Sequence, residues 1–261
     1  MPKANIVIPG VWWVGCSTWG GVTEQLSDTG SGNVFLVGGN GDFALIDAGT
    51  AEGVPFVLEN AASVGVSARD IHCVVITHAH SDHFLGAPLL REKTGAKLAA
   101  APEAAKALSG IDAAKLFLRE DHGFKPFSTD VILDEGDTLT VGPYTFKAMM
   151  TPGHIPGSVT LFGDVGGKKC LFTGDSAIGD QAGMSGVVGW LDGHWQSNPK
   201  TMLKSLERMR DCNADIMLPG HGFPIVGRRN VRKSLSHCIA RVKKLLAIPS
   251  LGSMMMLDLT D

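Results

Sequence analysis

The sequence predicts an α/β protein in which two mixed β-sheets pack face to face and helices cover their outer sides. Short apolar runs are followed by stretches of helical spacing, and this order occurs in both halves of the chain. Many of the 33 glycines and 13 prolines lie in short loops between these runs. The length of 261 residues, 44% of them apolar, is enough for a sizeable core and excludes a disordered or fibrous chain.

The first half of the chain contains mainly predicted strands. A glycine-rich turn at residues 38–41 lies between two apolar runs, as is typical of a hairpin, and residues 73–76 form a β-branched run suited to a strand buried on both faces. Strands are expected at residues 6–8, 11–14, 33–37, 43–46 and 73–76, and helices at residues 54–64, 85–93, 103–108 and 113–119.

The second half repeats this order of strands followed by helices. Pro199 favours the first turn of a helix that begins there. Strands are expected at residues 131–133, 139–141, 144–150, 159–162, 169–172 and 216–218, and helices at residues 199–210 and 227–246. Because the chain has no linker, low-complexity tract or repeat of fixed period, we expect a single domain over residues 1–261.

Charge and cysteine content exclude several classes of function. The net charge of −3 does not favour nucleic acid or an anionic membrane as a partner, and the basic residues of helix 227–246 alternate with apolar ones as on a solvated helix face. The five cysteines are widely spaced and form no Cys-x-x-Cys pair, which argues against a disulfide framework. No apolar run approaches the roughly 18–20 residues that span a bilayer, and residues 1–20 do not resemble a signal peptide. A cytoplasmic protein is expected.

A histidine-rich motif follows the buried strand at residues 73–76. His78, His80, Asp82 and His83 are four potential metal ligands within six residues, and they lie between the end of the strand and a helix. Imidazole nitrogens and carboxylate oxygens are the ligands that zinc and other first-row metals take. The motif therefore predicts a metal site at the carboxyl end of this strand.

Three further predicted strands each lead to one possible ligand. His154 follows the strand at residues 144–150, Asp175 follows residues 169–172, and His221 follows residues 216–218. A glycine precedes each ligand and allows the backbone to turn sharply. Because loops at strand ends gather along one edge of a packed sheet, we expect these ligands and the histidine-rich motif to converge on one site.

The combination of these motifs resembles the metallo-β-lactamase superfamily. The resemblance covers almost the whole chain, from Asn33 and Asp47 to the helix after His221, and it implies the superfamily's four-layer αβ/βα sandwich. The motifs that carry it are His78-x-His80-x-Asp82-His83, Gly153-His154, Gly174-Asp175 and Gly220-His221, in the order of the dinuclear hydrolases.

The resemblance implies a role for each of these residues. His78, His80 and His154 would bind a first metal, Asp82, His83 and His221 would bind a second, and Asp175 would bridge the two. Asp47 would support the ligand loops by accepting an imidazole N–H. The implied cofactor is a pair of Zn²⁺ ions, with iron or manganese as other possibilities.

The implied reaction is metal-assisted hydrolysis of a small molecule. Two metals that share a water lower its pKa towards neutrality, and the bridging hydroxide would attack an ester, thioester or lactone carbonyl. The catalytic carboxylates would be Asp175, which bridges the metals, and Asp82, which can also transfer a proton.

Within the superfamily, the glyoxalase II-like and lactonase branches match the pattern best. True β-lactamases generally lack the carboxylate found here as Asp175, so β-lactam hydrolysis is expected only as a side activity. The nuclease branch has a longer chain, the tRNA-processing branch has a basic arm, and the di-iron oxygen reductases have Glu in place of His80.

Glyoxalase II adds a helical domain, whereas 40 residues (222–261) follow His221 here. Many lactonases have a Tyr just after the bridging Asp, whereas the single tyrosine, Tyr144, lies on a predicted strand.

Two other functions remain open. A mononuclear iron sulfur dioxygenase of the same family would use His78, His154 and Asp175 for iron. A non-catalytic binding module on the same scaffold is the weaker alternative, because such modules commonly lose ligands and this chain has lost none.

Tryptophan-bearing segments are the candidates for a substrate pocket. Trp12 and Trp13 are expected to pack inside the sandwich. Trp19, Trp190 and His194 are candidate pocket residues, and they would suit a partly apolar or acyl-bearing substrate. The methionine-rich tail at residues 251–259 could contact the core or the second subunit of a homodimer.

Overall fold

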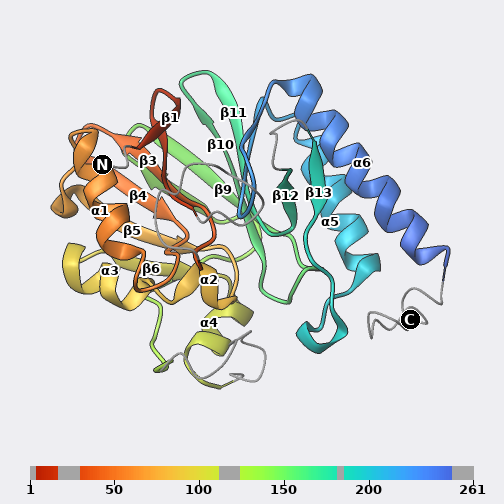
Figure 1. Cartoon of the computed structure of the whole chain (residues 1–261), viewed down its shortest axis with the longest axis horizontal. Helices are drawn as coiled ribbons and strands as arrows, with labels where there is room; N and C mark the ends of the chain where they lie inside the picture. The colour runs from red at the N-terminus through yellow and green to blue at the C-terminus, as the bar shows by residue number, and fades with distance from the viewer. Residues whose placement is uncertain (1–3, 17–29, 112–123, 181–184, 249–261) are drawn as a thin grey trace.

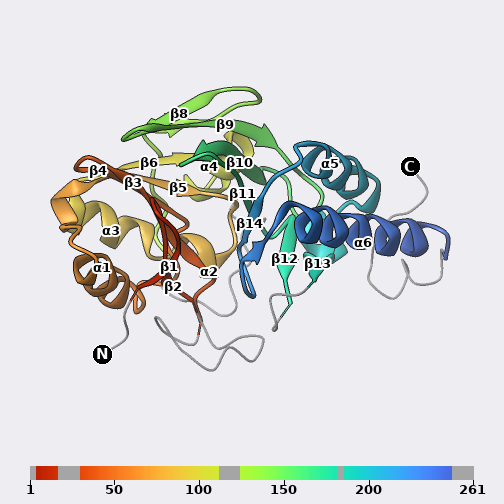
Figure 2. The ribbon, with the colours of Figure 1, turned by 90° about the horizontal axis from the view of Figure 1, so that it is seen from above.

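The computed structural model describes residues 4–16, 30–111, 124–180 and 185–248. Two mixed β-sheets pack face to face, and helices cover their outer sides (Figure 1). Figure 2 shows α1 (Val54–Ser63) and α3 (Ala87–Thr94) on one side of the sheets, and α5 (Pro199–Asp211) and α6 (Arg228–Leu246) on the other. The predicted α/β sandwich is confirmed.

The first sheet contains seven strands in sequential order, from β1 to β7. Neighbours from β1 to β4 are antiparallel, and neighbours from β4 to β7 are parallel. The strands are β1 (Asn5–Ile8), β2 (Val11–Gly15), β3 (Val34–Gly39), β4 (Asp42–Ile46), β5 (Ile71–Ile76), β6 (Lys97–Ala100) and β7 (Val131–Ile132). Val74, Val75 and Ile76 of β5 are fully buried, because β5 is flanked by β4 and β6 and lies in the core.

The second sheet contains six strands in the order β15-β14-β11-β10-β9-β8, and its only parallel pair is β11 with β14. β12 and β13 form a separate hairpin. The strands are β8 (Thr138–Val141), β9 (Tyr144–Met150), β10 (Val159–Val165), β11 (Lys168–Gly174), β12 (Ala177–Gly179), β13 (Gly186–Val188), β14 (Ile216–Pro219) and β15 (Ile225–Val226).

Two apolar clusters hold these layers together. The larger lies between the sheets and includes the fully buried Phe146 and Phe172, which make an edge-to-face ring contact. The smaller lies beneath α5 and α6 and includes Met202, Leu206 and Leu235. Burial of these side chains removes apolar surface from water, which is the main force that holds each helix layer on its sheet.

Most predicted elements are present, with two kinds of difference. The predicted helix at residues 85–93 begins earlier and is interrupted: α2 (Ser81–Phe84) precedes α3, because the Gly86 N–H donates to the Gly49 carbonyl instead of continuing a helix. The strands β6, β12, β13 and β15 were not predicted. The helix α4 (Pro102–Leu108) matches its prediction, whereas the helix predicted at residues 113–119 lies outside the described residues.

Among the described residues, no helix has both the length and the apolar composition needed to cross a membrane. Short 3₁₀ helices occur within the described residues at Ala68–Asp70 and Gly193–Trp195. The second of these lies in the connection from β13 to α5, close to the site described next.

Candidate metal centre

The first sheet brings one half of the site together at the carboxyl ends of β4 and β5. These strands are parallel, so Asp47 after β4 lies beside Thr77 after β5, and the Thr77 N–H donates to Asp47 Oδ1 at 2.7 Å. His78 and His80 follow Thr77 in an extended turn, and Asp82 and His83 lie in the first turn of α2.

The second sheet supplies the other half from three strand ends. His154 lies in the loop between β9 and β10, Asp175 directly follows β11, and His221 follows β14. β11 and β14 are parallel, and the Gly220 N–H donates to the Gly174 carbonyl at 2.8 Å. This pairing places Asp175 and His221 next to each other at the edge that faces β5.

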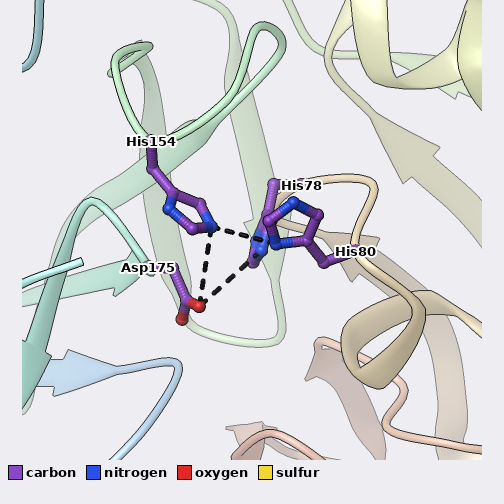
Figure 3. A group of neighbouring side chains, drawn as sticks. All are labelled: His78, His80, His154 and Asp175. Atoms are coloured by element: carbon purple, nitrogen blue, oxygen red, sulfur yellow. Dashed lines mark hydrogen bonds and ion pairs between the residues drawn. The ribbon is translucent and has the colours of Figure 1, made fainter. Parts of the chain in front are cut away.

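The seven residues that the sequence proposed as ligands lie together in two neighbouring groups, one of four residues and one of three. Figure 3 shows the first group, in which His78, His80, His154 and Asp175 turn towards one another. His154 Nε2 lies 3.0 Å from His80 Nδ1 and 3.7 Å from Asp175 Oδ2, and His78 Nε2 lies 3.9 Å from the same oxygen.

The second group consists of Asp82, His83 and His221. His221 Nε2 lies 3.0 Å from Asp82 Oδ2 and 3.2 Å from His83 Nε2. Asp175 joins the groups, because its Oδ1 lies 3.6 Å from His83 Nε2 and its Oδ2 lies 3.4 Å from His221 Nε2. Its carboxylate therefore faces both groups at once.

Hydrogen bonds behind the site fix the tautomers of three histidines. His154 Nδ1 donates to the carbonyl of Trp190, which can only accept, and His83 Nδ1 donates to Asp47 Oδ2 at 2.9 Å. The Thr77 hydroxyl donates to Asp47, so it accepts from His78 Nδ1. Each of these rings therefore keeps its Nδ1 proton behind the site and directs Nε2, the nitrogen that can bind a metal, towards the other ligands.

Burial and neighbouring charges shift the pKa values of these groups. Burial lowers the pKa of His78, His80 and His154, which keeps their imidazoles neutral. Burial alone would raise the pKa of Asp175, but the charges of His221 and His83 hold it well below its usual value. The first group thus offers neutral imidazoles and an ionised carboxylate.

In the second group, neighbouring carboxylates raise the pKa values of the histidines, whereas burial lowers them in the first group. Burial acts to lower the pKa of His221, but Asp175 and Asp82 raise it to about 10, and Asp82, Asp175 and Asp47 likewise raise the pKa of His83. The pKa of Asp82 is held far below its usual value by His83 and His221, against the effect of burial. The carboxylates therefore create a strongly negative potential that attracts cations.

The donor set fits two divalent metal ions. The ligand atoms of each group lie within 4.8 Å of one another, and all are imidazole nitrogens or carboxylate oxygens. His78 Nε2 is buried and has no hydrogen-bond partner among the described residues. Gly220 leaves space beside the ligands, because a Cβ there would lie 2.2 Å from Asp175 Oδ1 and 2.8 Å from His83 Cε1.

The site opens to solvent on the side of the second group. The side chains of His221 and Asp82 are 21% and 27% exposed, whereas those of His78 and His154 are 1% exposed. Solvent therefore reaches the second group more readily than the first.

The predicted pocket residues have different positions. Trp190 reaches the site through its backbone carbonyl, while its side chain is 56% exposed and lines a groove of about 240 Å³ against Val242 and Leu245 of α6. His194 is exposed and pairs with Asp192 at 3.0 Å. Trp19 lies outside the described residues.

Trp12 and Trp13 belong to the packing of the sandwich, as predicted. Trp13 is 4% exposed and makes an edge-to-face contact with Phe223, and Trp12 packs on Phe43. The methionine-rich segment at residues 251–259 lies outside the described residues.

The sequence did not identify a positioning role for Asn33. Its side chain donates to the carbonyls of Pro219 and Gly222, both at 2.8 Å, and accepts from Trp13 Nε1 at 3.1 Å. Asn33 therefore ties the His221 loop to the first sheet. The sequence does hold a signal for this role: Asn33 is a polar residue at the start of a fully apolar predicted strand. A buried polar side chain there needs hydrogen-bond partners.

Comparison with known proteins agrees with this geometry. A model of the metallo-β-lactamase superfamily matches residues 27–221. Beta-lactamase-like protein 2 homolog of Caenorhabditis elegans is 24% identical over 218 residues, which cover 83% of this chain and 64% of that protein. Hydroxyacylglutathione hydrolases of Pseudomonas putida and Cereibacter sphaeroides are 27% and 30% identical over 65% and 66% of this chain, and over 49% and 64% of their own lengths. The chain thus spans between about half and two thirds of these relatives.

Solved structures show the same fold. A Cronobacter sakazakii metallo-β-lactamase with a HARLDQ motif superposes with a TM-score of 0.74 at 20% identity, over 94% of this chain and 89% of that one. The subclass B3 metallo-β-lactamase BJP-1 of Bradyrhizobium japonicum superposes with a TM-score of 0.71 at 21% identity, over 94% of each chain. The family match covers most of the chain and agrees with both the fold and the two ligand groups, so this protein belongs to the metallo-β-lactamase superfamily.

Proposed function

We propose that this protein is a hydrolase that binds two metal ions, preferably zinc, and cleaves an ester, thioester or lactone of a small molecule. The observation that carries the proposal is the complete second group of Asp82, His83 and His221, joined to the first group by the carboxylate of Asp175.

Each residue has a defined part in the proposed reaction. His78, His80 and His154 would hold one metal, Asp82, His83 and His221 would hold the other, and Asp175 would contact both. Two metal ions bound there supply a water of lowered pKa and polarise the carbonyl of the substrate. Hydrolysis adds this water across the acyl bond, so the products are a carboxylic acid and an alcohol or a thiol.

Asp82 is the carboxylate best placed for proton transfer. Its side chain is 27% exposed, whereas that of Asp175 is 8% exposed. A carboxylate at the opening can accept a proton from the attacking water and return it to the leaving oxygen or sulfur. Asp175 is enclosed by His83, His154 and His221, so its proposed part is to hold the two metals at a fixed separation.

Two observations support an acyl-bearing substrate. Relatives named hydroxyacylglutathione hydrolase, at 27% and 30% identity, act by name on an acylated glutathione. The exposed Trp190 and the groove beside it offer apolar surface on the segment whose carbonyl bonds to His154. The described elements share one pair of packed sheets, which also supports the proposal of a single domain over residues 1–261.

The proposal is tested by metal analysis of the purified protein together with a panel of substrates. We expect about two metal ions per chain and turnover of a lactone, a thioester or a carboxylic ester, with phosphoesters and β-lactams as comparison substrates. The variant Asp175→Asn should lose turnover and bind less metal, because the amide cannot replace an ionised carboxylate between two cations.

A single iron per chain with consumption of oxygen would contradict the proposal and would instead indicate a sulfur dioxygenase. Two metals per chain with no turnover of any acyl substrate would refute the substrate class while leaving the dinuclear centre in place. Efficient turnover of β-lactams alone would identify a lactamase.

A further inference from the structure

The loop that carries His154 is held by serine hydroxyls that come from outside the metal site. This loop connects β9 to β10 at residues 151–158. Ser176 Oγ donates to the Thr151 carbonyl at 2.9 Å, and Ser205 Oγ donates to the Pro152 carbonyl at 2.7 Å. Both serines and Thr151 are buried and Pro152 is partly buried, so these bonds satisfy carbonyls with little access to water.

Ser197 makes the corresponding bond to His154 itself. Its hydroxyl donates to the His154 carbonyl and accepts from the Asp192 N–H at 3.0 Å. The imidazole of His154 donates from Nδ1 to the carbonyl of Trp190. The segment at residues 190–197 therefore forms two hydrogen bonds with His154, one to its backbone carbonyl and one to its imidazole ring.

The second ligand group is oriented by residues from other parts of the chain. Asp47 orients His83, and Asn33 holds the loop of His221. Asp47 directly follows β4 and Asn33 directly precedes β3, both strands of the first sheet. The two groups thus have separate supports.

We propose that Ser197 is a positioning residue for the first ligand group. It sets the orientation of His154 and thereby the metal affinity of the group formed by His78, His80 and His154. The inference rests on the proposed function only as far as metal binding, and it requires no particular substrate.

The physical basis is the cost of an unsatisfied buried carbonyl. Without the Ser197 hydroxyl, the His154 carbonyl loses its donor and the Asp192 N–H loses its acceptor, while the side chain is only 8% exposed. The loop and the segment then relax independently. The bond from His154 to Trp190 loses its fixed geometry, and the ring is no longer preorganised for a metal.

The test is the zinc affinity of metal-free protein, measured by calorimetric titration for Ser197→Ala in two backgrounds. His221→Ala disables the second group and leaves the first, whereas His80→Ala disables the first group and leaves the second. We expect Ser197→Ala to weaken zinc binding by about 10- to 100-fold in the His221→Ala background. In the His80→Ala background, the change should stay within about twofold, because His154, whose carbonyl accepts from Ser197, belongs to the first group.

Ser205→Ala is the matched control, because Ser205 donates to a carbonyl of the same loop, that of Pro152, and not to the carbonyl of His154. It should weaken zinc binding by the first group much less than Ser197→Ala does. Ser197→Thr, which keeps the hydroxyl, should restore most of the affinity.

Three results would overturn the inference: an equal effect of Ser197→Ala in both backgrounds, an equal effect of Ser205→Ala, or no effect at all. The first two would mean that Ser197 serves only the general stability of the fold or loop. These outcomes differ from a failure of the proposed hydrolase activity, which would appear as zinc binding without turnover in the unmutated protein.

Discussion

Asp47 supports ligands from two successive segments of the chain. It has a left-handed backbone with φ of 65°, which is uncommon outside glycine but is tolerated by Asp and Asn. Its two carboxylate oxygens accept from the Thr77 N–H, the Thr77 hydroxyl and His83 Nδ1. One carboxylate thus orients His83 directly and His78 through Thr77.

Asp47→Asn should weaken metal binding by about 10- to 100-fold without unfolding the protein. Asparagine tolerates the left-handed backbone, but its amide offers a single acceptor oxygen to three converging donors, and its NH₂ group would face one of them. Zinc affinity by calorimetric titration and thermal unfolding of the metal-free protein measure the two effects.

Asp42→Asn is the control for this substitution, because Asp42 accepts from His72 and from the Gly142 N–H at a part-exposed position away from the ligands. It should leave zinc affinity unchanged. Equal zinc affinities for Asp47→Asn and the unmutated protein would show that Asp47 does not orient His83.

The elements that could be predicted from the sequence have a local signal. Residues 73–76 are apolar and β-branched and form the buried strand β5, and Pro199 marks the start of α5 within one residue. The ligands were predicted because the histidine-rich motif follows one apolar run, and His154, Asp175 and His221 each come after a glycine within four residues of another. Convergence of the ligands that follow one sheet could be inferred, since strand ends of one sheet share an edge, whereas the meeting of ligands from two different sheets is seen only in the structure.

The elements that escaped prediction depend on distant contacts. β6 reads Lys-Leu-Ala-Ala, which has no strand propensity, and becomes a strand because it pairs with β5 on one side and β7 on the other. The serines that hold the His154 loop escaped for the same reason. Ser176 and Ser205 lie 25 and 53 residues away from their partners along the chain.

The start of α5 is stabilised by Asn198, whose side chain accepts from the Thr201 N–H at 2.9 Å. Asn198→Ala should lower the free energy of unfolding by about 1 kcal/mol, because an amide at the end of the helix loses its acceptor. Urea unfolding followed by circular dichroism measures the change. Asn198→Asp keeps an acceptor, so its free energy of unfolding should be close to that of the unmutated protein. An equal loss of free energy of unfolding in both variants would show that the hydrogen bond to the Thr201 N–H does not stabilise the helix.

At the scale of the whole molecule, the site joins the two sheets. His78, His80, Asp82 and His83 follow β5 of the first sheet, whereas His154, Asp175 and His221 follow strands of the second sheet. Each ligand group includes residues from both sheets. A metal ion in either group would therefore crosslink the two halves of the sandwich.

This arrangement predicts that bound metal stabilises the fold. A metal that binds only the folded chain adds about 2.7 kcal/mol per site when its free concentration is about 100 times Kd, so removal with a chelator should lower Tm. Differential scanning calorimetry with EDTA, and with the same EDTA already saturated with zinc as control, measures the effect. Asp175→Asn should remove most of the difference between the two conditions, because Asp175 from the second sheet contacts histidines of both groups. A Tm that is the same with and without the chelator, in a protein shown to carry two metals, would contradict a crosslink between the sheets.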